Sequence, residues 1–90
     1  MEIKWTRAAT KHRISRDRSG YVVRTTTTIL RQPAPADSQA ADDRLVFLGA
    51  DKSGDLLEVV AVETESGLLI IHAMPMRAKY AELLKGGADA

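Results

Sequence analysis

The chain has no cysteine, and this absence removes several classes of protein at once. Without a thiol there is no disulfide scaffold, no thiolate metal centre and no cysteine nucleophile. Aromatic residues make up only 4% of the chain, which gives poor support for a base-stacking platform of the single-strand-binding kind. A length of 90 residues leaves room for one modest core. We therefore expect a single domain over residues 1–90, with any activity on a shallow surface groove.

Long hydrophobic runs are absent as well. The longest apolar stretch, Leu68–Met74, is interrupted by His72 and is far too short to cross a bilayer. The basic segment Met1–Ile14 lacks the apolar run of a signal peptide. We therefore expect a cytoplasmic protein with no membrane partner.

The charged residues are distributed unevenly along the chain. A net charge of +1 conceals a basic N-terminal third and an acidic middle. Residues 1–31 hold eight bases and two acids, whereas residues 32–67 hold two bases and eight acids. This asymmetry indicates a polyanionic or acidic partner for the basic end, although a solvated helix face explains it equally well.

Capping residues and hydrophobic patterns predict an α+β fold. Thr6 and Ser15 are expected to cap two N-terminal helices. Three β-rich segments joined by short glycine-containing turns predict antiparallel hairpins. These segments are Arg44–Gly49, Leu56–Glu63 and Leu68–Ala73. With a short helix after Pro75, the expected architecture is N-terminal helices packed on a three-stranded or four-stranded antiparallel sheet.

Three segments are less clear from the residues alone. Ser15–Arg31 has apolar residues at helical spacing, but its run Thr25–Thr28 is β-branched and favours strand, so both alternatives stay open. Residues 32–43 contain two prolines, small residues and acids, and we expect a flexible acidic loop there. The middle strand, Leu56–Glu63, is apolar in both alternating sets. This pattern indicates either a central strand covered on both faces or a self-association surface.

Common catalytic and metal-binding motifs are missing. Asp51-x-Ser53-x-Asp55 resembles the start of a calcium loop, but the glycine and the terminal glutamate that such a loop requires are not in place. No phosphate-binding glycine loop, dinucleotide fingerprint or nucleophile elbow is present. His12 and His72 lack the neighbouring ligands of a zinc site. We therefore expect neither a metal nor a cofactor.

Basic residues and two histidines form the candidate site. Lys11, His12 and Arg13 close the first expected helix, and His72 ends the third expected strand. If the helices lie across the sheet, these residues and the bases that follow Pro75 line one groove. RNA is cleaved through its own 2′-hydroxyl, so such a groove needs only a base, an acid and positive charge around the phosphate. The catalytic candidates are His12, His72, Lys79 and Tyr80, and the nucleic-acid-binding candidates are Lys11, Arg13, Arg16 and Arg77.

Several of these candidates also have a purely structural interpretation. Tyr80 falls in the apolar stripe of the expected C-terminal helix, where a core position is the commoner explanation. His72 can simply close a strand with its ring half buried. Arg77 and Lys79 can belong to an ordinary solvated face.

Two stretches of the chain resemble the BrnT toxins. Trp5–Ser15, with Lys11-His12 inside it, is similar to the family's Trp-Asp start and Lys-His-Gly-hydrophobic-Ser turn. Gly49–Ala73 is similar to the family's Gly…Leu-Leu-x-Val-Val…Ile-Ile-Ser-Ala strand pair, so the resemblance covers Trp5 to about Leu84.

The chain departs from the family pattern at several positions. Thr6 and Arg13 stand where the family has aspartate and glycine, and Met74 stands where it has an arginine. Either His72 and Arg77 have taken over the missing charge, or ribonuclease activity is absent.

The resemblance implies a small bacterial toxin of a type II toxin–antitoxin pair, in the RelE/ParE-like group, with helices packed on an antiparallel sheet. It favours helix for Ser15–Arg31. It implies a metal-independent endoribonuclease acting on mRNA, with RNA and a cognate antitoxin as partners, and we also expect a homodimer. The alternative is a non-catalytic toxin-fold binding module that associates with itself or with a small protein partner.

Overall fold

Within the part of the chain that the structure describes, the assigned elements are five strands, one α-helix and two short 3-10 helices. The computed structural model describes residues 2–33 and 43–84. In chain order the elements are β1 (Glu2–Trp5), η1 (Arg7–Thr10), α1 (Arg16–Thr25), β2 (Thr28–Gln32), β3 (Arg44–Ala50), β4 (Leu56–Glu63), β5 (Gly67–Pro75) and η2 (Ala78–Tyr80). Helical conformation continues after η2 over residues 81–84. No helix within the two described ranges is long and apolar enough to cross a membrane.

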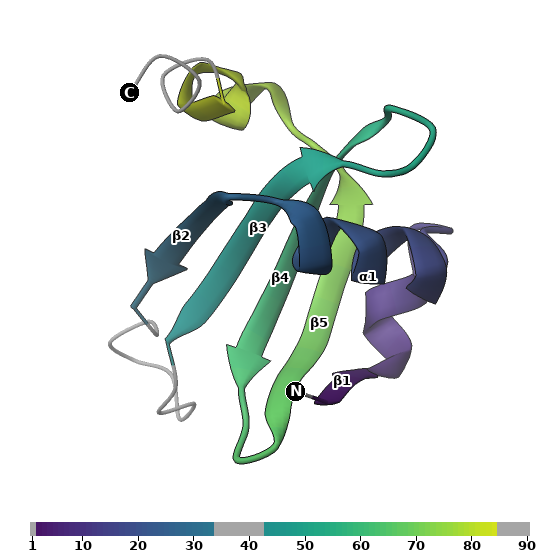
Figure 1. The fold of residues 1–90 in the computed structure, drawn as a ribbon, viewed down its shortest axis with the longest axis vertical. Helices are drawn as coiled ribbons and strands as arrows, with labels where there is room; N and C mark the ends of the chain where they lie inside the picture. The colour runs from purple at the N-terminus through teal and green to yellow at the C-terminus, as the bar shows by residue number, and fades with distance from the viewer. Residues whose placement is uncertain (1, 34–42, 85–90) are drawn as a thin grey trace.

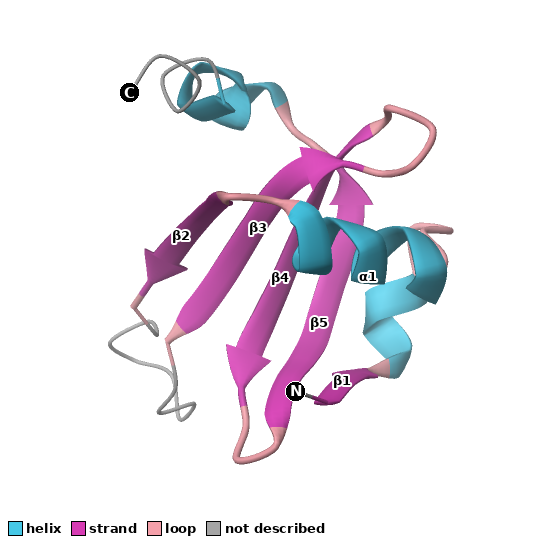
Figure 2. Cartoon of the chain, viewed as in Figure 1, coloured by secondary structure: helices cyan, strands magenta, loops and turns pink. Residues whose placement is uncertain are grey.

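The strands form one mixed sheet in the order β1-β5-β4-β3-β2 (Figure 1). From β2 to β5 the chain is an antiparallel meander, in which each strand pairs with the next. β1 instead pairs in parallel with β5, with Trp5 opposite Ile70. The register of β4 against β5 shifts between Val60 and Ala61. Figure 2 shows α1 lying across one face of this sheet.

The predicted architecture of helices on a three-stranded or four-stranded antiparallel sheet was wrong. The three predicted strands are present as β3, β4 and β5, but the sheet has five strands and is mixed. The additional strands, β1 and β2, lie in the N-terminal third, where helices were expected. β1 has only 4 residues and pairs with β5, which is distant in the sequence, so no local sequence pattern predicts this strand.

The ambiguous segment Ser15–Arg31 contains both helix and strand. α1 ends at Thr25 and β2 begins at Thr28, so the described N-terminal region has one α-helix and one 3-10 helix instead of two α-helices. The β-branched threonines account for the change. The Thr26 hydroxyl donates to the Leu48 carbonyl and accepts from the Thr28 amide at 3.2 Å, which fastens this corner to β3. Of the expected loop 32–43, residues 34–42 lie outside the described residues.

Both expected N-caps are confirmed. The Thr6 hydroxyl accepts a hydrogen bond from the Ala9 amide, and the Ser15 hydroxyl accepts one from the Arg18 amide, each at 3.2 Å. The Ser15 hydroxyl satisfies an amide of the first turn of α1, whereas the Ala9 amide is shared between the Thr6 hydroxyl and the Thr6 carbonyl, the latter at 3.1 Å. Between the two helices Arg13 has φ 64°, a left-handed conformation that glycine adopts far more easily than arginine.

The two faces of the sheet carry separate apolar clusters. α1 covers the first face, where Val22 belongs to the same buried cluster as Val59. The segment after β5 covers part of the second face, where Tyr80 packs with Leu48 and the partly buried Val60. β4 therefore supplies residues to both clusters. Its two apolar sets are explained by a central strand covered on both faces, the first of the two alternatives above.

Gly67 is the residue whose replacement should loosen β1. A Cβ at Gly67 would lie 2.0 Å from the backbone oxygen of Glu2, whereas a Cβ at Gly54, which has φ +88°, would meet nothing within 4 Å. We expect Gly67→Ala to lower the free energy of unfolding by about 2 kcal/mol or more through this clash. Gly54→Ala should cost about 1 kcal/mol, from its left-handed backbone alone. Urea unfolding measures both, and equal losses in the two variants would contradict the close approach of β1.

Candidate active site

The two histidines of the chain, sixty positions apart in the sequence, meet beside β5. His12 lies in the turn between η1 and α1, and His72 lies on β5. Their ring centroids are 5.3 Å apart with the planes at 72°, an edge-to-face arrangement. β1 ends opposite Ile70, so η1 rather than a strand packs beside the following part of β5, as Figure 1 shows. The early end of β1 is thus what brings the two imidazoles together.

A buried carboxylate lies next to this pair in the sheet. Glu58 on β4 is fully buried and pairs with Met74, two positions along the ladder from the pair formed by Val60 and His72. Its carboxylate accepts hydrogen bonds from Arg77 Nε at 2.9 Å, Arg77 Nη2 at 2.9 Å and the Arg77 amide at 3.0 Å. Three donors from one residue hold both oxygens, which is the forked geometry that arginine makes best.

The charged state of Glu58 depends on this arginine. Burial would raise the pKa of the Glu58 carboxyl, but the side-chain and backbone hydrogen bonds from Arg77 outweigh burial and hold the pKa below its ordinary value of 4.5. The same contact raises the pKa of Arg77. The site therefore contains a permanent ion pair whose acidic half is inaccessible, while 51% of the Arg77 side chain faces solvent.

His72 is influenced by all of these groups. Burial is the main cause that lowers the pKa of His72 below 6.5; the nearby His12 and Arg77 lower it further, and Glu58 opposes them. His72 is therefore a neutral imidazole at neutral pH, able to accept a proton. Its neighbour His12 is exposed to solvent.

The Tyr80 ring lies next to two cations of the C-terminal segment, Arg77 and Lys79. The Arg77 guanidinium lies 5.7 Å and the Lys79 ammonium 4.9 Å from the centroid of its ring. Both distances fall within the range of cation–π attraction. The ring itself is 6% exposed and packs with Val46 and Leu48, so Tyr80 is a core residue that also orders two bases.

The remaining candidates lie around the η1–α1 turn. Lys11 and Arg13 are exposed and flank His12 in sequence. Arg16 lies with its guanidinium carbon 5.6 Å from the centroid of the Trp5 ring. The eight candidate residues thus fall into a histidine pair with adjacent bases, a C-terminal group of Arg77, Lys79 and Tyr80, and the separate Arg16.

Glu58 is the residue that the sequence interpretation missed. Its signal is present in the chain, since it is the only acid within the apolar run Leu56–Val62. An acid in a central strand must find a partner because an unpaired buried carboxylate is very costly. In the structure Arg77 is that partner, through three hydrogen bonds to the Glu58 carboxylate.

Stability should fall on acidification, beginning with His72. In the folded protein the pKa of His72 lies below 6.5, so the unfolded chain binds more protons as the pH falls through this range and folding is disfavoured. The lowered pKa of Glu58 adds a second loss below pH 4.5. Urea unfolding at pH 7.5 and 5.5 should show a decrease for the wild type and a smaller one for His72→Gln. His12→Gln should keep most of the decrease because burial is the main cause; an unchanged decrease in His72→Gln would contradict this assignment.

Comparison with protein-family models, with curated proteins and with solved structures finds no match to this chain. The resemblance of Trp5–Ser15 and Gly49–Ala73 to the BrnT toxins therefore stays a prediction from sequence motifs. The chemistry of the site follows from the side chains that the fold brings together.

Proposed function

We propose that this protein is an endoribonuclease that cleaves mRNA without a metal ion, as the toxin of a toxin–antitoxin pair. The observation that carries the proposal is the pairing of the imidazoles of His12 and His72 at 5.3 Å, one half-buried and one exposed. Two imidazoles in unlike surroundings are suited to the roles of general base and general acid. The site needs no protein nucleophile because RNA supplies its own.

The proposed reaction is an internal transfer at phosphorus. A ring nitrogen of His72 takes the proton of the 2′-hydroxyl, and the 2′-oxygen attacks the adjacent phosphorus. The bond from phosphorus to the 5′-oxygen breaks, and protonated His12 gives its proton to that oxygen. The products are a 2′,3′-cyclic phosphate and a free 5′-hydroxyl, so protons and charge balance.

Arg77 supplies the positive charge that the transition state needs. Glu58 engages its Nε and one Nη2 hydrogen, which leaves the other donors of the guanidinium for phosphate oxygens. Lys79 lies beside it over the Tyr80 ring, and Lys11 and Arg13 extend the positive surface around His12. An acidic segment of an antitoxin that covered these bases would block both RNA binding and cleavage.

One observation favours the alternative of a non-catalytic binding module. β2 is one of the two edge strands of the described sheet, and Ile29 on it is 48% exposed. An unpaired strand edge with an exposed apolar side chain is suited to pairing with a second copy or with a small protein. This alternative predicts association without RNA cleavage.

Cleavage of RNA by the purified protein tests the proposal directly. We expect the wild type to cut single-stranded RNA in the presence of a chelator and to leave 2′,3′-cyclic phosphate ends. His12→Gln and His72→Gln should each lose about 100-fold or more of the rate, as is typical for removal of a general acid or base. Arg7→Ala, which removes an exposed base from η1, is the matched control and should keep the rate.

Two results would overturn the ribonuclease proposal. One is a folded wild type that leaves RNA intact and does not arrest growth when expressed. The other is a cleavage rate unaffected by both histidine substitutions. A dimer or a stable complex in the absence of cleavage would support the binding module instead.

A further inference from the structure

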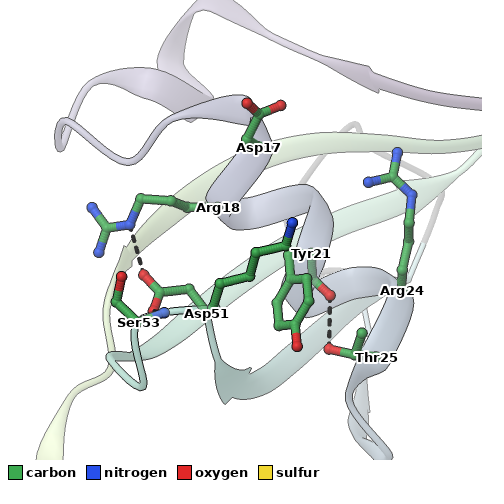
Figure 3. A pocket seen from close by; sticks show the side chains of 8 residues that line it. Asp17, Arg18, Tyr21, Arg24, Thr25, Asp51 and Ser53 are labelled. Atoms are coloured by element: carbon green, nitrogen blue, oxygen red, sulfur yellow. Dashed lines mark hydrogen bonds and ion pairs between the residues drawn. The ribbon is translucent and has the colours of Figure 1, made fainter.

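A hollow of about 490 Å³ lies between α1 and the β3–β4 turn (Figure 3). One wall is a face of the helix, where the lining positions recur at helical spacing. These are Asp17, Arg18, Tyr21, Arg24 and Thr25. The opposite wall is the β3–β4 turn, which adds Lys52 and Ser53. The hollow shares no residue with the histidine pair or with the Glu58–Arg77 ion pair.

The two walls are held together by a buried acid. Asp51, whose side chain is 2% exposed, accepts a hydrogen bond from Arg18 Nε at 2.7 Å, seen as a dashed line in Figure 3. It also accepts from the amides of Ser53 at 2.9 Å and Asp55 at 3.0 Å. The hydrogen bond from Arg18 is the main cause that lowers the pKa of Asp51. The hollow is therefore preformed, and the charge of Arg18 is satisfied within its wall.

Two cations in the hollow have no such partner. Within the two described ranges, Arg24 and Lys52 form no ion pair. The Lys52 ammonium lies 5.8 Å from the centroid of the Tyr21 ring, which holds this charge over an aromatic wall. Asp17 precedes Arg24 by two helical turns, roughly 10 Å along the axis, so this acid is separated from the Arg24 end of the hollow. The basic end attracts an anion next to an aromatic ring.

We propose that this hollow binds a nucleotide, with its phosphate on Arg24 and Lys52 and its base or sugar against Tyr21. Arginine and lysine are the usual ligands of phosphate, and the Ser53 hydroxyl adds a donor at the same wall. The volume of the hollow lies within the range of small-molecule sites. The phosphate belongs either to a free nucleotide or to an RNA strand, which offer the same chemistry. The inference does not depend on the ribonuclease proposal, because the residues of the two sites are separate.

Isothermal titration calorimetry with two probes tests the site. The probes are 5′-AMP and a 2′-O-methylated hexanucleotide, which has no free 2′-hydroxyl and so cannot be cleaved internally. We expect saturable binding that weakens about tenfold in Arg24→Ala and in Lys52→Ala, since each removes one charge-assisted contact. Arg7→Ala should bind within twofold of the wild type, and so should His72→Gln. His72→Gln distinguishes this site from the cleavage site, because this variant should lose RNA cleavage and keep nucleotide binding.

The outcomes divide clearly. Binding of 5′-AMP that depends on Arg24 and Lys52 identifies a free-nucleotide site, and binding of the hexanucleotide alone with the same dependence identifies a contact to an RNA strand. The proposal is overturned if neither probe binds the wild type. The proposal is also overturned if Arg24→Ala and Lys52→Ala both bind the probe with an affinity within twofold of the wild type.

Discussion

The ion pair between Glu58 and Arg77 is the interaction on which the rest of the molecule depends. A carboxylate in the middle of a five-stranded sheet has to be neutralised or matched by donors, and here every donor comes from Arg77. The chain after β5 must therefore fold back over the second face of the sheet. That return places Tyr80 against Val46 and Leu48 and fixes Lys79 over the ring. The same pair also sets the charge that surrounds His72.

The uneven charge of the chain is partly balanced by ion pairs within the fold. The acidic middle supplies Asp51, Glu58 and Glu63, which pair with Arg18, Arg77 and Arg31 from the segments on either side. Each pair joins elements that are distant in sequence, so opposite charges act as links between α1, the sheet and the C-terminal segment. Among the described residues, Lys11 and Arg13 form no ion pair, and the uncompensated positive charge includes the turn that holds His12.

Local signals in the sequence predicted local structure well. The caps at Thr6 and Ser15 and the strands β3, β4 and β5 follow from residues that are neighbours in the chain. The strands β1 and β2 were missed for different reasons. β1 is defined by its distant partner β5, and β2 shares its threonines with a segment whose apolar spacing is helical.

The sequence pointed to the basic residues of the candidate site but not to its buried acid, Glu58. Sequence patterns placed Arg77 and Lys79 together, with Arg77 as a phosphate ligand and Lys79 as a catalytic candidate, whereas in the structure Glu58 occupies part of the Arg77 guanidinium. The Asp51-x-Ser53-x-Asp55 pattern shows the same limit. It resembles the start of a calcium loop, but the rest of the loop is missing. In the structure the Asp51 carboxylate accepts hydrogen bonds from two amides of its own turn and from the side chain of Arg18. The partner of a carboxylate depends on tertiary contacts, which the spacing of residues in the sequence does not predict.

The parallel pairing of β1 with β5 determines when the site can exist during synthesis. β1 is made early, whereas β5, which it joins and which carries His72, is the last strand of the meander. Arg77 follows later still. A nascent chain therefore holds His12 without its partner, and the histidine pair forms only when β5 has emerged. Because η1 packs beside β5, the meeting of the two imidazoles has to wait for the last strand of the sheet.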